Sequence, residues 1–264
     1  MTSHWDAIRR HWQLLGPPLR PPPDAVETYE RELDLQSAHV LLLGVTPELA
    51  DLGKTMLAVD ESASMIASIW PGDTGTRKAV IGNWLDLPIA SNSVDAVIGD
   101  GCLSALHSST ARLHLLAEIE RVLKPGGRAG LRLFAGPEAP DDLAAVRELT
   151  LAGGVATFHE LKWRIAMSCT GGYPDRAIKV KAILKAFDAL FADREELSLA
   201  TGWDMAVIGT IDVYATSQAS YSFASAAVLV GEASRHFGRG RLAPTGTYDM
   251  VERCPLLVLE QPRR

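Results

Sequence analysis

Short runs of apolar residues alternate with amphipathic stretches between residues 38 and 136, and this alternation predicts strands separated by helices. Unbroken apolar runs of about five residues suit strands that are buried on both faces, as in a parallel sheet. Repeated strand–helix units favour an open sheet with helices on both sides. The predicted fold is therefore α/β, with a doubly wound, mostly parallel sheet. Strands are predicted at His39–Leu43, Thr55–Asp60, Lys78–Gly82, Val94–Asp100 and Arg128–Phe134.

Helices are predicted between these strands. Pro47 is expected to begin one over residues 48–53, because proline is tolerated in the first turn of a helix. A second helix is predicted over Ser62–Ile69, and a third begins with Ser109 or Thr110 as its cap. The third is amphipathic, with Leu113, Leu116, Ile119 and Leu123 on its apolar face and Arg112, Glu118 and Arg121 elsewhere.

The periodicity divides the chain into four parts. Residues 1–37 form an N-terminal helical arm, which a proline-rich stretch near residue 20 interrupts. Residues 38–136 form the core with the predicted strands, and residues 238–264 add the last strands of the sheet. Residues 137–237 form a helical insert between them, with helices expected over residues 140–149, 158–169, 175–191, 195–199, 205–211 and 222–237.

Composition excludes several classes of protein. The chain has 264 residues, 47% of them hydrophobic, which is enough for a sizeable core. Its formal net charge of -6 disfavours binding to a nucleic-acid backbone. Cys102, Cys169 and Cys254 are scattered, so neither a disulfide framework nor a metal site is expected. Without a signal peptide or a long apolar stretch, we expect a soluble cytoplasmic protein with no membrane partner.

Chemically distinctive residues follow the predicted strands. Gly44 ends the first strand, Asp60 the second, Asn83 and Trp84 come after the third, and Asp100-Gly101 closes the fourth. In open α/β sheets, ligands bind beyond the carboxyl ends of the strands, where the strand order reverses. A carboxylate in the position of Asp60 can accept both hydroxyls of a ribose, and a glycine lets a ligand approach the backbone. These residues predict a nucleoside-binding cleft.

Several segments resemble the class I S-adenosylmethionine-dependent methyltransferases. Val40–Glu48 is similar to the glycine-rich first motif of that family, and Ala58–Ile66 to its acidic end of the second strand. Gly82–Pro88 is similar to its Gly-Asp-x-x-x-Leu-Pro segment, with Asn83 in place of the acid. Ser93–Val97 and Glu120–Gly127 are similar to its fourth strand and to the turn before its fifth. The resemblance implies the seven-stranded, mostly parallel sheet of that family.

The resemblance also implies a cofactor, S-adenosylmethionine, and roles for individual residues. Asp60 would bind the ribose, Met65 and Trp84 would border the adenine, and Asn83 would contact its polar edge. Only one glycine follows the first strand, because Thr46 and Glu48 stand where glycine is common, so the strength of cofactor binding stays open. The full set of expected cofactor-binding residues is Gly44, Val45, Thr46, Asp60, Met65, Asn83, Trp84, Asp100 and Gly101.

Several of these residues also have a purely structural interpretation. Gly44 can serve as a turn glycine, Asp60 as a loop carboxylate, and Met65 or Trp84 as core side chains. His107, shortly after the fourth strand, is the best-placed candidate base, although a surface histidine is the more common case. Cys102 is interpreted as a small buried residue. Helix packing is the first interpretation and lid formation the second for Trp12, Arg20 and Tyr29.

The predicted function is methyl transfer to a small molecule whose identity the residues do not reveal. The alternative is a related module that binds the cofactor without turnover. A nicotinamide oxidoreductase is disfavoured because the chain has no GxGxxG. The helical insert is expected either to shape the acceptor pocket or to pair two copies as a homodimer. The candidate pocket residues in the insert are Trp163, Tyr173, Tyr214 and Tyr221.

Overall fold

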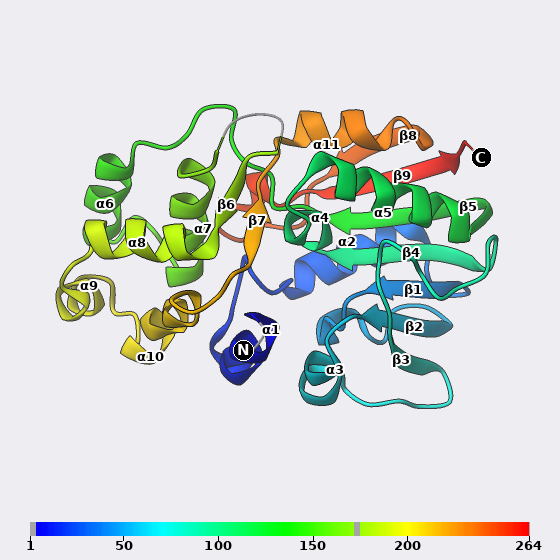
Figure 1. Cartoon of the computed structure of the whole chain (residues 1–264), viewed down its shortest axis with the longest axis horizontal. Coiled ribbons are helices and arrows are strands. Elements are labelled where there is room, and N and C mark those ends of the chain that lie inside the picture. Colours follow the sequence, from blue (N-terminus) through cyan, green and yellow to red (C-terminus); the bar gives the residue numbers. More distant parts are fainter. Residues whose placement is uncertain (1–3, 172–174, 264) are drawn as a thin grey trace.

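A seven-stranded sheet forms the centre of the molecule in the computed structural model, which describes residues 4–171 and 175–263 (Figure 1). The strand order is β3-β2-β1-β4-β5-β9-β8. The first five strands run parallel, while β9 is antiparallel to both of its neighbours. The predicted doubly wound, mostly parallel sheet is thereby confirmed. Its strands are β1 (His39–Leu43), β2 (Thr55–Asp60), β3 (Arg77–Ile81), β4 (Val94–Asp100), β5 (Leu123–Arg132), β8 (Phe237–Ala243) and β9 (Leu256–Pro262).

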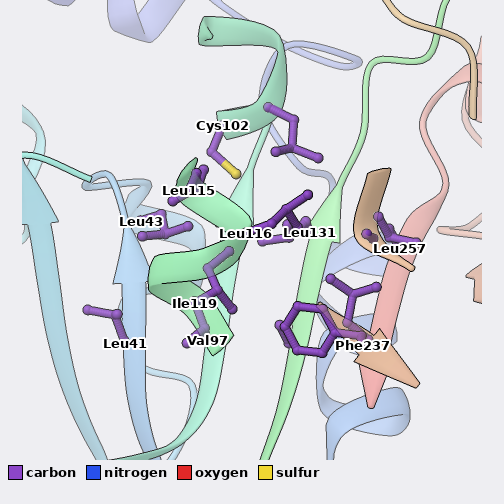
Figure 2. Close-up of a cluster of buried hydrophobic side chains, with 14 of the residues drawn as sticks. Leu41, Leu43, Val97, Cys102, Leu115, Leu116, Ile119, Leu131, Phe237 and Leu257 are labelled. Atoms are coloured by element: carbon purple, nitrogen blue, oxygen red, sulfur yellow. The ribbon is translucent and has the colours of Figure 1, made fainter. Parts of the chain in front are cut away.

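Helices cover both faces of the sheet, and β1 supplies apolar side chains to each. Leu41 and Leu43 point to the face covered by α5 (Ser109–Val122) and α11 (Ala226–Ala233), as Figure 2 shows for α5. Val40 and Leu42 point to the other face, where α2 (Pro23–Leu33) and α3 (Ala63–Ile69) pack. This alternation along one strand explains why the sequence reads as an unbroken apolar run.

The apolar face predicted for α5 is confirmed at Leu116, Ile119 and Leu123, which are buried, and was wrong at Leu113 and Arg112. Leu113 is only half-buried, and the buried positions are Leu115, Leu116, Ile119 and Val122. Arg112, expected off this face, is fully buried and donates to both carboxylate oxygens of Glu232 on α11, at 2.8 and 2.7 Å. When only the helical pattern is known, an arginine is assigned to the solvent-exposed face of the helix. A partner 120 positions further along the chain reverses that assignment here.

Two further predictions of local structure were wrong. The helix expected over residues 48–53 is a single 3-10 turn, Pro47–Leu49. The helix expected over residues 175–191 begins as β6 (Ala177–Lys179), which pairs with β7 (Ser220–Ser222), and only α8 (Val180–Leu190) is helical. Both strands are three residues long, too short for a two-residue period to be recognised.

The insert packs around its own apolar cluster, which includes Phe158, Ile183 and Phe187. Figure 1 shows its helices beyond the carboxyl ends of the parallel strands. Helix α11, at the end of the predicted insert, contacts α5 and β8 and so covers the sheet. The other helices of the insert are α6 (Leu143–Leu151), α7 (Phe158–Ser168), α9 (Arg194–Thr201), α10 (Met205–Ile208) and the 3-10 helix η3 (Gly209–Tyr214).

The N-terminal arm bridges the two parts of the molecule. Its first helix, α1 (His4–Ile8), contacts both α3 of the core and η3 of the insert (Figure 1). The following 3-10 helix, η1 (Arg9–Leu14), also contacts α3. None of the helices in the described residues is both long and apolar enough to cross a membrane.

Candidate active site

A cavity of about 390 Å³ opens where the strand order reverses, between β1 and β4. The carboxyl ends of neighbouring parallel strands form one side of it, which is the usual place for a ligand in such sheets. The structure brings all nine predicted cofactor-binding residues to this cavity: Gly44, Val45, Thr46, Asp60, Met65, Asn83, Trp84, Asp100 and Gly101.

Gly44 lies at the meeting point of three loops. Its φ of +95° is strained for a residue with a side chain. A Cβ at this position would lie 3.6 Å from Cζ2 of Trp84 and 3.9 Å from Oδ2 of Asp60. The ends of β1 and β2 and the loop after β3 therefore converge on one small space, and the glycine keeps that space open.

Asp60 offers one unoccupied carboxylate oxygen to the cavity. Its Oδ1 accepts a hydrogen bond from the Ser62 amide at 2.8 Å, while no donor in the described part of the chain reaches Oδ2. Burial raises the pKa of this carboxyl to about 6, because the charged form loses hydration. A carboxylate in this state gains free energy from O–H donors on a bound ligand.

Trp84 and Asn83 are held by local hydrogen bonds. The indole Nε1 of Trp84 donates to the Val59 carbonyl at 2.7 Å, which fixes the ring across the end of β2. The side-chain Oδ1 of Asn83 accepts from the Leu85 amide at 2.9 Å and shapes the turn. That oxygen keeps a second lone pair for a ligand. Met65, on the buried face of α3, packs in the core and also lines the cavity.

Asp100 is engaged by a residue that sequence reasoning missed. Arg132, at the end of β5, donates from Nε and Nη2 to the two carboxylate oxygens of Asp100, at 2.5 and 3.0 Å. Both side chains are buried, with exposed fractions of 0% and 5%. Arg132 also donates to the Pro18 carbonyl at 2.9 Å, so the pair connects the sheet to the arm. Asp100 therefore holds the loop of Gly101 in place.

Comparison with known proteins agrees with this geometry. Residues 44–131 match the methyltransferase domain family. The core of the chain is therefore similar to methyltransferase domains over these residues. Demethylmenaquinone methyltransferases of Corynebacterium glutamicum and Corynebacterium efficiens are 36% identical over 111 residues, which cover 42% of this chain and 44% of each relative. The chain thus spans less than half the length of the curated relatives it matches.

Solved structures share the fold over most of the chain. A SAM-dependent methyltransferase of Methanosarcina mazei superimposes with a TM-score of 0.53 at 15% identity, over 93% of this chain and all (100%) of that one. A protein of Rhodobacter sphaeroides described as a putative Zn-dependent alcohol dehydrogenase gives a TM-score of 0.57 at 11% identity, covering 100% of both chains. At such identities the likeness concerns the fold alone.

The cavity has features that suit S-adenosylmethionine. The free oxygen of Asp60 matches the hydroxyl donors of a ribose. A side chain at Gly44 would intrude between Trp84 and Asp60, where the glycine leaves room for the sugar and the adjoining chain. The residues present therefore fit this cofactor.

Two other candidate residues, His107 and Cys102, do not line the cavity. His107 is exposed and is not among the described residues that line the cavity. Cys102 is buried in the core on the α5 side of the sheet, where burial raises the pKa of its thiol to about 12. The thiol is therefore protonated at neutral pH and unsuited to nucleophilic attack.

The arm closes the cavity from outside. Trp12 lines it, so the lid interpretation holds for this residue. Arg20 stacks over the Trp12 ring at 5.4 Å and pairs with Glu48, while Tyr29 is a core residue whose hydroxyl donates to the Gly99 carbonyl at 2.8 Å. The described lining residues from the arm are Trp5, Ile8, His11, Trp12, Leu15 and Leu19.

The insert supplies the remaining wall. Of the predicted pocket residues, Trp163, Tyr214 and Tyr221 line the cavity, and Tyr173 lies outside the described residues. His4 of the arm bonds to the Tyr221 hydroxyl at 2.7 Å and to Ser217 Oγ at 2.9 Å, which ties the lid to the insert. The far end of the cavity is therefore largely aromatic.

Lys162, on α7, is a cavity residue that sequence reasoning missed. Only 3% of it is exposed, and the ammonium nitrogen lies 5.5 Å from the Tyr214 ring and 6.0 Å from the Trp163 ring. No hydrogen bond or ion pair reaches this nitrogen from the described residues. Burial alone lowers its pKa from 10.5 to about 7. The available signal was a lysine between the apolar residues Leu161 and Trp163.

This lysine makes stability depend on pH. Its pKa is lower in the folded state, so the unfolded chain binds more protons between pH 7 and pH 10.5, and stability rises with pH in that range. From pH 7 to pH 9 the wild type should gain about 2 kcal/mol relative to Lys162→Met. Urea unfolding at both pH values measures this difference. The variant of an exposed lysine, Lys185→Met, should gain as much stability between pH 7 and pH 9 as the wild type. An equal gain in Lys162→Met would contradict the lowered pKa of Lys162.

Proposed function

We propose that the chain transfers a methyl group from S-adenosylmethionine to a small molecule. The observation that carries this proposal is the convergence of Gly44, Asp60 and Trp84 on one cavity at the reversal of strand order. The matched domain covers residues 44–131, so the activity of the whole chain is inferred from the site. The aromatic far wall then faces the acceptor.

Each proposed role follows from the contacts. Asp60 Oδ2 accepts the ribose hydroxyls, while Met65 and Trp84 border the adenine. Asn83 accepts from its amino group through the second lone pair. The methionine part lies along the backbone of Gly44, Val45 and Thr46, with the Asp100-Gly101 turn at its end.

When bound, the cofactor supplies an electrophilic methyl group on sulfur. The contribution of the protein is then to hold the acceptor in line with that methyl, and positioning alone is worth about 7–11 kcal/mol. The arm and the insert enclose the space in which this alignment takes place.

Two observations support a small acceptor with an apolar body. The cavity is bordered by the rings of Trp5, Trp12, Trp163, Tyr214 and Tyr221. The curated relatives methylate demethylmenaquinone, which is itself a small molecule. Pairing of two copies through the insert, absence of a nucleic-acid partner and a cytoplasmic location stay predictions.

Calorimetry with S-adenosylmethionine and its demethylated product S-adenosylhomocysteine tests the proposal. Both are expected to bind the wild type, and Gly44→Val should abolish the heat, because its side chain would enter the space beside Trp84 and Asp60. Gly72→Val is the matched control. Its φ is +98°, yet no atom lies within 4 Å of the added Cβ, so it carries the same backbone strain in open space.

Wild-type protein that binds neither compound would refute the proposal. Equal binding by Gly44→Val and Gly72→Val would remove Gly44 from the site. Cofactor binding with no turnover in the presence of a broad pool of metabolites would favour the alternative, a binding module without catalysis.

A further inference from the structure

Lys162 places an amine in the aromatic half of the cavity with no opposite charge beside it. The titratable groups that face it are His4 from α1, His159 from its own helix, Tyr214 from η3 and Tyr221 from β7. Burial lowers the pKa of His4 to about 4 and that of His159 to about 3, so both are neutral at pH 7. Burial raises the pKa of Tyr221 and Tyr214 above 10, so both phenols keep their protons.

A buried amine without a partner costs free energy, so its retention at a ligand site needs an explanation. The buried indole Nε1 of Trp163, on the same wall, also has no acceptor within the described part of the chain. Two unsatisfied donors on one wall match a ligand that brings an oxygen acceptor. The carboxylate of Asp100, which could attract a cationic ligand, is instead bound to Arg132.

We propose that Lys162 binds the acceptor oxygen and removes its proton, and that the acceptor is a flat aromatic compound with a weakly acidic hydroxyl. This inference rests on the proposed methyl transfer. An amine acceptor would find no anionic partner near Lys162, and a carboxylic acid would need no base. An aromatic hydroxyl needs both the stacking surfaces and the base that this wall provides.

The proposed step balances. The acceptor hydroxyl gives its proton to the neutral amine of Lys162, and the resulting ammonium pairs with the oxygen anion. A lone pair of that oxygen forms the new bond to the methyl carbon while the carbon–sulfur bond breaks, and its electrons stay on sulfur. Lys162 later returns the proton to solvent. An amine that titrates near neutral pH is suited to both transfers.

The probe for this role is 4-nitrophenol, whose ionised form absorbs at a longer wavelength than the phenol. Spectrophotometric titration with saturating S-adenosylhomocysteine is expected to show that wild-type protein lowers the pH at which the bound probe ionises. At pH 7 the wild type should bind the probe about tenfold more tightly than Lys162→Met. Lys185→Met, on the exposed side of α8, should equal the wild type.

A second ligand separates the charge of Lys162 from its volume. 4-Nitroanisole has the same ring but no acidic proton, so it should bind wild type and Lys162→Met equally, which also shows that the variant keeps the cavity. Unchanged probe ionisation in the wild type, or an equal shift in Lys162→Met, would overturn this inference while S-adenosylhomocysteine still binds. If the wild type does not bind S-adenosylhomocysteine at all, the proposed methyl transfer itself is refuted.

Discussion

Asp100→Ala is expected to lower the free energy of unfolding by about 3–5 kcal/mol. The substitution removes the only carboxylate found beside the buried Arg132 in the described chain, and so leaves a guanidinium charge without hydration or compensation. The loss should be larger than for most single substitutions, because both members of the pair are almost completely buried. Urea unfolding followed by circular dichroism measures it.

The same strand offers a matched control. Asp95, at the other end of β4, pairs with Lys124 at 2.7 Å, but each side chain is 36% exposed. Asp95→Ala should therefore cost less than about 1 kcal/mol. The double variant Asp100→Leu/Arg132→Met should recover much of the lost stability, since it removes both charges. Equal losses for Asp100→Ala and Asp95→Ala would contradict the importance of burial.

Asp60→Asn is expected to weaken binding of S-adenosylhomocysteine by about 10- to 100-fold. Hydrogen bonds to a charged group contribute about 1.5–3 kcal/mol, and the substitution removes the charge while keeping the shape. Because the pKa of Asp60 is raised to about 6, wild-type affinity should fall by about tenfold per pH unit below pH 6. Affinity in the variant should not follow that slope. Calorimetry between pH 5 and pH 8 measures both effects.

Two controls separate binding from folding. Glu61→Gln changes the neighbouring, exposed carboxylate that also lines the cavity, and should alter affinity less than about twofold. Asp60→Asn itself should be more stable than the wild type at pH 7, because the folded state disfavours the ionised carboxylate. An affinity that is unchanged in Asp60→Asn and flat across the pH range would remove Asp60 from the ribose site.

The cavity has two sides. The ends of the parallel strands form one side, and aromatic residues of the arm and the insert form the other. The strand ends lie within residues 44–131, which match the methyltransferase domain family, whereas the arm and the insert lie outside the matched residues. Among the described residues, Lys162 is the only lysine that is almost completely buried, and it lies on the wall formed by the insert.

Local patterns were sufficient to predict the parallel strands of the sheet and the strand-end residues that line the cavity. The strands β1 to β5 are recognised in the sequence as apolar runs, and in a parallel sheet their carboxyl ends all lie at one edge. Residues that follow strands directly, such as Gly44 and Asp60, are thus brought together by topology alone. Six of the nine expected residues follow from the strand ends in this way, whereas Val45, Thr46 and Met65 were expected from the resemblance to a known family.

The burial of three charged residues depended on contacts between segments that are distant in the sequence. Lys162 and Arg132 were missed, and Arg112 was assigned to the wrong side of its helix, because a charged side chain in an amphipathic pattern is read as solvated. Arg132 and Arg112 are buried beside carboxylate partners 32 and 120 positions away, whereas Lys162 is buried among aromatic rings. Periodicity describes the direction in which a side chain points on its own helix or strand. Only the assembled fold determines whether that side chain meets solvent, an apolar core or a charged partner.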